Sequence, residues 1–134
     1  MRRLAGLLVL LAGPAFAQDP ACPFPGQSPM LVVQMFFGQS IRGTGLISHR
    51  AWERFVADTI TPALPGGFTL YDAHGQWQDP ATRVIGREHA AVLVVAAPDT
   101  PALRVGITGI GEAFRRRFDQ RSVGIVSTPG CAAF

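Results

Sequence analysis

The chain of 134 residues has no lysine, no asparagine, only two cysteines and few charged residues of any kind (16%). Its positive charge comes from 12 arginines, which face nine acidic residues. Arg2 and Arg3 lie in a segment that we expect to be removed, and without them the excess is a single charge. So small an excess attracts a phosphate backbone weakly, which argues against nucleic acid as a partner. The hydrophobic content of 48% is too high for a disordered chain, and the length fits one domain.

Several motifs are also missing, and each absence removes a class of function. There is no CxxC pair for redox chemistry and no G-x-S-x-G turn for a serine nucleophile. After residue 17, no apolar run is long enough to cross a bilayer. We therefore expect no cofactor, no metal site of recognised spacing and no membrane insertion of the mature chain, and we lean away from an enzyme.

The N-terminus has the pattern of a secretory signal peptide. Arg2 and Arg3 precede a short apolar run at 4–11, and Ala15-Phe16-Ala17 is a small-x-small cleavage site. The run is too short for a membrane span. We expect cleavage after Ala17 and a periplasmic or secreted product.

The two cysteines, Cys22 and Cys131, lie near the two ends of the mature chain. Export would place them in an oxidising compartment, where an even number of cysteines favours a disulfide. Free thiols or an intermolecular bridge are the less favoured alternatives. A Cys22–Cys131 bond would close a loop around nearly the whole domain.

Hydrophobic periodicity predicts an extended lead-in over 18–29 and a single domain over 30–134. The first half of that domain should hold a strand, a helix capped by Ser48 and stopped by Pro62, and a strand that bends at His74-Gly75. The second half should hold a long strand, a helix capped by Thr100 and a short strand ended by Pro129-Gly130. The predicted elements cover residues 30–37, 49–61, 68–77, 84–97, 101–118 and 122–127.

The predicted order β-α-β-β-α-β favours an α+β domain with the ferredoxin-like arrangement. In that fold a four-stranded antiparallel sheet carries two helices on one face. The first and last strands are antiparallel neighbours, which would bring Cys22 and Cys131 together. Two independent readings of the sequence thus agree.

The first and third predicted strands, 30–37 and 84–97, are apolar on both faces. Helices cover one face of such a sheet, so the other face needs a second cover. We expect a homodimer that packs sheet against sheet. The alternative is a cover made by the lead-in or by a long loop of the same chain.

Polar residues of the second and third strands are the candidate binding or pocket residues: Asp72, His74, Trp77, Arg87 and Glu88. In an even register, the hairpin would place His74 near Glu88 as an acid–base or binding pair. The more ordinary interpretation is an exposed cross-strand ion pair, which is common and weak.

A metal site could use His74 and His89 with an acid such as Asp72 or Glu88. In a regular strand, however, His89 and Glu88 point to opposite faces. The ligand spacing also matches no known motif. A periplasmic metal binder is therefore the weakest of the functional hypotheses.

Most of the mature chain resembles a family of short exported bacterial proteins classified as domain of unknown function 3574. The resemblance rests on segments spread from Phe37 to Val126 and on the adjoining strand end at Phe36. They are Phe36-Phe37-Gly38, Ser48 with Trp52 and Phe55, residues 61–69, Gly75-Gln76-Trp77, Arg87-Glu88, residues 117–120 and Ser122-Val123. The family pattern has arginine and phenylalanine where this chain has Ala63 and Leu64. The resemblance implies the fold and export, and it implies no chemistry.

The first functional hypothesis is a non-catalytic module that binds a small molecule or another envelope protein. The alternative is a cofactor-free enzyme on a dimeric ferredoxin-like scaffold, with His74, Arg87 and Glu88 as acid–base or anchoring groups. That alternative rests on analogy between folds.

Overall fold

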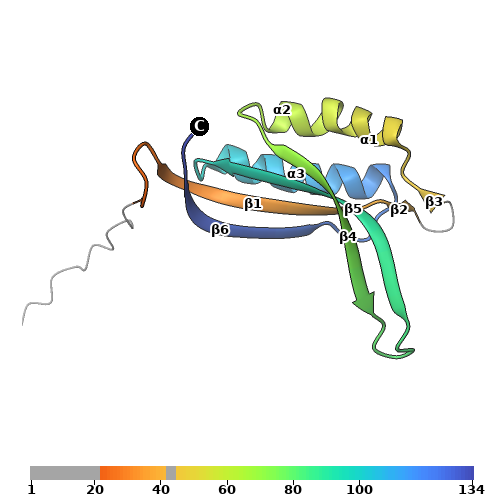
Figure 1. Cartoon of the computed structure of the whole chain (residues 1–134). Coiled ribbons are helices and arrows are strands. Elements are labelled where there is room, and N and C mark those ends of the chain that lie inside the picture. The colour runs from red at the N-terminus through yellow and green to blue at the C-terminus, as the bar shows by residue number, and fades with distance from the viewer. Residues whose placement is uncertain (1–21, 42–44) are drawn as a thin grey trace, which may run out of the picture.

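The computed structural model describes residues 22–41 and 45–134. The predicted signal peptide, residues 1–17, and the start of the lead-in lie outside the described residues. The elements follow the order β1(Ser28–Gly38), β2(Ser40–Ile41), β3(Gly45–Leu46), α1(His49–Phe55), η1(Val56–Ile60), α2(Thr61–Ala63), β4(Thr69–Gln78), β5(Ile85–Ala97), α3(Pro101–Arg117) and β6(Gly124–Ala132) (Figure 1). No helix in these ranges is long and apolar enough to cross a membrane.

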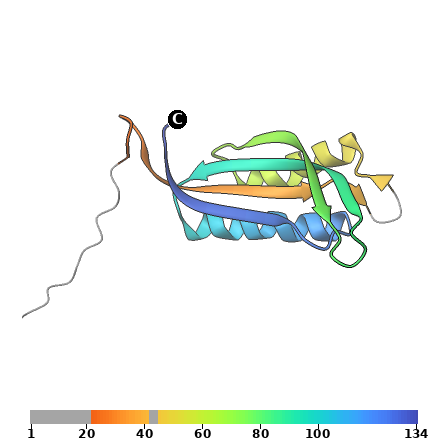
Figure 2. The same cartoon turned by 60° about the horizontal axis from the view of Figure 1, so that its bottom comes forward.

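The four long strands form one antiparallel sheet in the order β4-β5-β1-β6. Both helical layers, α1 to α2 and α3, lie on the same face of this sheet (Figure 1), and the opposite face carries no helix (Figure 2). The predicted ferredoxin-like α+β fold is confirmed, including the pairing of the first strand with the last. The two-residue strands β2 and β3 form a small separate pair between the first predicted strand, 30–37, and the first predicted helix, 49–61.

An aromatic cluster fills the space between the sheet and the helices. Phe37, Phe55 and Phe114 are fully buried. The Phe114 ring centroid lies 4.9 Å from that of Phe37 and 5.5 Å from that of Phe55. Tilted and edge-to-face contacts of this kind add to the gain from burial alone. This cluster fixes both helices on one face of the sheet.

Both predicted N-caps are confirmed. The Ser48 hydroxyl accepts a hydrogen bond from the backbone N–H of Ala51 at 3.3 Å. The Thr100 hydroxyl accepts one from the N–H of Leu103 at 3.1 Å. Each cap satisfies one of the donors that a helix start leaves free.

The prediction that Pro62 stops the first helix is wrong. The helical path continues through Pro62 to Ala63. The α-helical hydrogen-bond pattern changes earlier, at the wide turn η1, where the N–H of Thr61 donates to the Val56 carbonyl five residues back. Pro62 then lies at the start of α2, where a helix needs no N–H from that residue.

Pro129-Gly130 likewise does not end the last strand, which runs to Ala132. Pro129 pairs with Leu31 of β1, and β6 is an edge strand. An edge strand tolerates proline because it needs a ladder on one side only.

The hairpin of β4 and β5 extends beyond the end of β1 and curls toward the helix-free face (Figure 1). Its loop is closed by Asp79, whose carboxylate accepts hydrogen bonds from the N–H groups of Ala81 and Thr82, both at 2.8 Å. The bonds from the Thr82 and Ala81 amides lower the pKa of Asp79. Arg83 adopts the left-handed conformation (φ 62°), which completes the turn. This loop sets the register of the hairpin.

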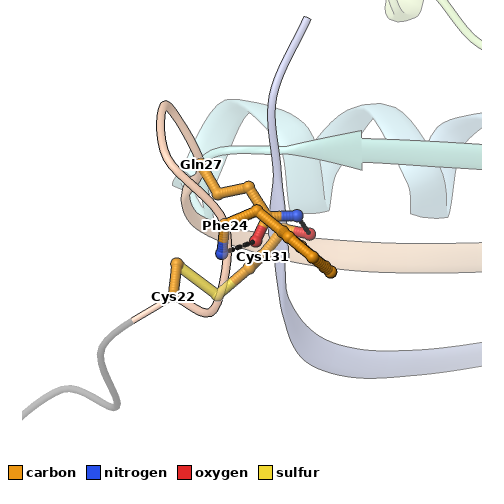
Figure 3. The surroundings of a disulfide bond; sticks show 4 residues. All are labelled: Cys22, Phe24, Gln27 and Cys131. Carbon is orange, nitrogen blue, oxygen red and sulfur yellow. Dashed lines mark hydrogen bonds between the residues drawn. A yellow bond between two sulfur atoms is a disulfide. The ribbon is translucent and has the colours of Figure 1, made fainter.

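The disulfide joins Cys22 to Cys131, as predicted, across 109 positions of sequence. The two Cα atoms are 5.7 Å apart, within the usual range for a disulfide. The Gln27 side chain reinforces the junction (Figure 3). Its amide nitrogen donates to the Cys131 carbonyl at 3.4 Å, and its amide oxygen accepts from the Phe24 N–H at 3.2 Å.

Candidate functional site

A hollow of about 750 Å³ lies where the curled hairpin meets the helix-free face of the sheet. The end of β1, the hairpin, and the segment between α3 and β6 supply its walls. The lining residues are Phe36, Gly38, Ser40, Ile41, Ala73, His74, Gly75, Trp77, Glu88, Ala90, Asp119, Gln120, Arg121, Ser122 and Gly124. A space of this size is typical of small-molecule sites.

Glycines beneath the large side chains shape this hollow. Trp77 pairs across the hairpin with Gly86, and a Cβ on Gly86 would lie 2.5 Å from atoms of the indole. Phe36 pairs with Gly124, where a Cβ would lie 3.3 Å from the phenyl ring. The two aromatic side chains therefore lie against bare backbone. Larger partners would displace both rings from these positions.

Glu88 lies between the aromatic walls and is partly buried. Its side chain rests over Gly75, its cross-strand partner, and over Gly38 of β1. A Cβ on Gly38 would lie 3.0 Å from Glu88 Oε2. Within residues 22–41 and 45–134, the carboxylate has no hydrogen-bond donor and no cationic partner. A carboxylate in this position can accept hydrogen bonds from a ligand.

The polar wall follows the end of α3. Asp119 adopts the left-handed conformation (φ 49°), and the next N–H, of Gln120, bonds to the Arg115 carbonyl at 3.0 Å. This arrangement ends a helix in a tight turn, usually with glycine in place of Asp119. The Gln120 amide then donates to the Ser40 carbonyl at 2.7 Å, which ties the wall to β2.

The structure separates the five predicted site residues into two groups. Trp77 and Glu88 face the hollow. Asp72, His74 and Arg87 belong to the opposite, helix-side set of the alternating strand pattern. His74 also lines the edge of the hollow, but its ring packs on that of His89.

The expected His74–Glu88 pair does not form. His74 lies opposite His89, and Glu88 lies opposite Gly75, because the loop at Asp79–Val84 sets an odd register instead of an even one. A one-residue slip sends a side chain to the other face of the sheet. His74 and Arg87 thus lie on the face opposite Glu88, so these three residues do not form one catalytic group. Arg87 instead donates from Nε to Gln76 Oε1 at 2.8 Å.

Residues of the hollow that the sequence analysis did not propose as site residues include Phe36, Asp119 and Gln120. The family resemblance could have indicated these residues, because all three lie in segments on which that resemblance rests. Those segments are far apart in sequence and meet at the hollow. Metal ligation by three or more side chains has no support here: residues 22–41 and 45–134 contain no such group of His, Cys, Asp and Glu.

Comparison with solved structures finds the same fold in a phage SAM lyase. In complex with S-methyl-5'-thioadenosine, that enzyme matches with a TM-score of 0.56 and 12% identity, over 78% of this chain and 90% of its own. In the apo state it matches with a TM-score of 0.53 and 14% identity, over 79% and 90%. At such low identity the likeness concerns the fold alone.

No curated protein matches the chain in sequence. A family model, in contrast, matches residues 33–134, which include most of the sheet, each helix that the structure describes and all the lining residues of the hollow. The chain therefore belongs to DUF3574, a family of proteins of unknown function.

Proposed function

We propose that this domain binds a small molecule in the hollow, and that the ligand combines a flat apolar body with a positively charged group. The observation that carries the proposal is Glu88, a partly buried carboxylate between Trp77 and Phe36 that has no partner among the described residues. Burying a charge is costly unless the charge is paired. A cationic ligand would supply the missing partner.

The aromatic walls support the same class of ligand. Trp77 is 52% exposed and Phe36 is 39% exposed, although both are large apolar side chains. An aromatic face attracts both a flat ring and a cation. Export to the periplasm or beyond forms part of the proposal, and the disulfide supports it because such bonds persist in oxidising compartments.

Tryptamine and tryptophol form a matched pair of probes, because both carry an indole and they differ in an ammonium against a hydroxyl group. We expect the mature domain to bind tryptamine more tightly than tryptophol. Glu88→Gln should weaken tryptamine binding roughly tenfold or more, since a charged hydrogen bond is lost, and should leave tryptophol binding nearly unchanged. Isothermal titration calorimetry measures both affinities.

Glu112→Gln is the matched control for this test. Glu112 is an exposed acid on α3 that pairs with Arg116, so its loss changes the net charge equally without touching the hollow. Equal losses in both variants would show general attraction by net charge and would contradict the proposal. An equal affinity of the unaltered domain for the two probes would also contradict it.

A cofactor-free enzyme is the second candidate, and the fold of the phage SAM lyase is what favours it. S-adenosylmethionine is a suitable further probe, because it joins a flat purine to a sulfonium cation. Recovery of the probe unchanged after incubation with the domain supports binding alone. Products that form with the unaltered chain and not with Glu88→Gln support catalysis at this hollow.

A second copy of the chain is the partner that we propose for the rest of the helix-free face. Support comes from the exposed side chains of Val126 and Tyr71, which lie on this face at the two edges of the sheet. The side chains between them are uncharged, and two copies related by a twofold axis can bury such a surface. Val126→Arg is expected to convert a dimer into a monomer in sedimentation equilibrium. Thr108→Arg, on the exposed side of α3, is the control. A monomeric unaltered domain at high concentration would overturn this part.

A further inference from the structure

Two histidines form a close pair on the outer face of the curled hairpin. His74 of β4 and His89 of β5 lie directly opposite each other, and their ring centroids are 4.6 Å apart with an angle of 56° between the rings. Both residues are exposed. His74 also lines the edge of the hollow, but alternation along the strands places the pair on the face opposite Glu88.

The backbone explains why the two rings are so close. The His89 carbonyl accepts a hydrogen bond from the N–H of Gln39, at 2.9 Å. In an antiparallel sheet the N–H and C=O of one residue point to the same side, so those of His89 point away from β4. His74 and His89 are therefore a non-hydrogen-bonded pair, the type in which facing side chains approach most closely. The sheet itself holds the two imidazoles together.

Two neighbouring imidazoles are good ligands for zinc, copper and nickel ions. Nitrogen atoms that bind one zinc ion in tetrahedral geometry lie about 3.3 Å apart, given metal–nitrogen distances near 2.0–2.1 Å. Rings whose centroids are 4.6 Å apart can reach this separation by small side-chain rotations.

One acidic and one basic side chain lie near the pair. Asp72 lies two residues before His74 on the same face of the strand, and its negative charge favours a cation. Arg87, two residues before His89, carries the opposite charge, and its Nε is held by Gln76 Oε1 at 2.8 Å. Residues 22–41 and 45–134 provide no third ligand in a metal-binding group, so water would complete the coordination.

We propose that His74 and His89 form a two-imidazole site that binds one divalent ion of the copper–zinc group per chain. The site does not depend on the function proposed for the hollow. Its affinity should follow the order of imidazole-binding metals, with Cu²⁺ tighter than Zn²⁺, and Mg²⁺ should not bind because it prefers oxygen ligands.

The test is a Zn²⁺ titration of the mature chain, prepared without a histidine tag and followed through the imidazole NMR signals. The chain has three histidines, and the third, His49, lies on α1 beside Glu53. We expect the His74 and His89 signals to shift together and saturate at one ion per chain, while the His49 signal stays in place. Equal responses from all three histidines would show nonspecific binding and would overturn the proposal.

Variants provide a second, independent readout. His74→Ala and His89→Ala should each weaken Zn²⁺ binding by at least about tenfold, since even outer-shell changes at metal sites cost 10–100-fold. The double variant should be little weaker than either single variant, because chelation needs both rings. His49→Ala should bind as the unaltered chain does. Urea unfolding curves check that each variant is folded, and full affinity in either single variant would refute the site.

Discussion

Replacing Phe114 by alanine is expected to lower the free energy of unfolding by about 4 kcal/mol, a loss typical of a large aromatic ring removed from a core. Phe114 is fully buried, and its ring lies 4.9 Å from Phe37 and 5.1 Å from Phe118, centroid to centroid. It also meets the Trp52 ring edge-on at 6.1 Å. One truncation therefore removes contacts between both helical layers and the sheet.

Urea unfolding with the disulfide intact measures this loss. Val105→Ala is the matched control, because Val105 lies on the same helix and is 72% exposed. We expect the control to change stability by less than about 0.5 kcal/mol. A loss below about 1 kcal/mol for Phe114→Ala would show that the core can collapse around the missing ring, and the aromatic cluster would then not be what holds the layers together.

Removing the disulfide is expected to cost a similar amount, about 4 kcal/mol, in the Cys22→Ser/Cys131→Ser double variant. The bond joins residues 109 positions apart, so its loss frees nearly the whole chain in the unfolded state. Gln27 makes two hydrogen bonds at the junction, of 3.2 and 3.4 Å, beside the pairing of β1 with the end of β6. These contacts exist only in the folded domain, so they cannot replace the restraint that the covalent link places on the unfolded chain.

The experiment compares urea unfolding of the unaltered domain and the double variant, each with and without a reducing agent. The reductant should destabilise the unaltered domain and leave the double variant unchanged. If the reductant lowered the stability of both proteins equally, the effect would not come from this bond. If neither the variant nor the reductant changed stability, the link would contribute nothing to the folded state.

The parts of the fold that the sequence could predict are those governed by local chemistry. Ser48 and Thr100 act as caps wherever a helix starts, because their hydroxyl groups bond to the next turn. The strand-helix order then restricted the topology to one common solution, and that solution brought Cys22 and Cys131 together. Periodicity and cysteine pairing were thus consistent with each other.

The failures all depend on context that lies outside the local sequence. Whether Pro62 ends a helix depends on the wide turn before it, and whether Pro129 ends a strand depends on which strand lies at the edge. The register of the hairpin depends on the geometry of the loop from Asp79 to Val84, including the left-handed Arg83. A change of one residue there exchanges the partners of His74 and Glu88.

The candidate site could be predicted only in part, because its residues come from segments that are far apart in the sequence. Trp77 and Glu88 are two of the few large or charged side chains on the hairpin, so they were recognisable in the sequence. Phe36 and Asp119 come from segments far away in sequence, and only the folded chain brings them to the same hollow. The role of two glycines is also visible only in the folded chain: Phe36 packs on Gly124, and Trp77 packs on Gly86.

The position of the two ends of the domain has a practical consequence. Cys22 and the C-terminus lie together at one end of the sheet, while the hairpin and the hollow lie at the other (Figure 1, Figure 2). A surface, a carrier protein or a fluorescent label joined after Phe134 would therefore be held away from the hollow. Molecules immobilised in this way would present the hollow outward and share one orientation, which suits the domain to sensor chips and display formats.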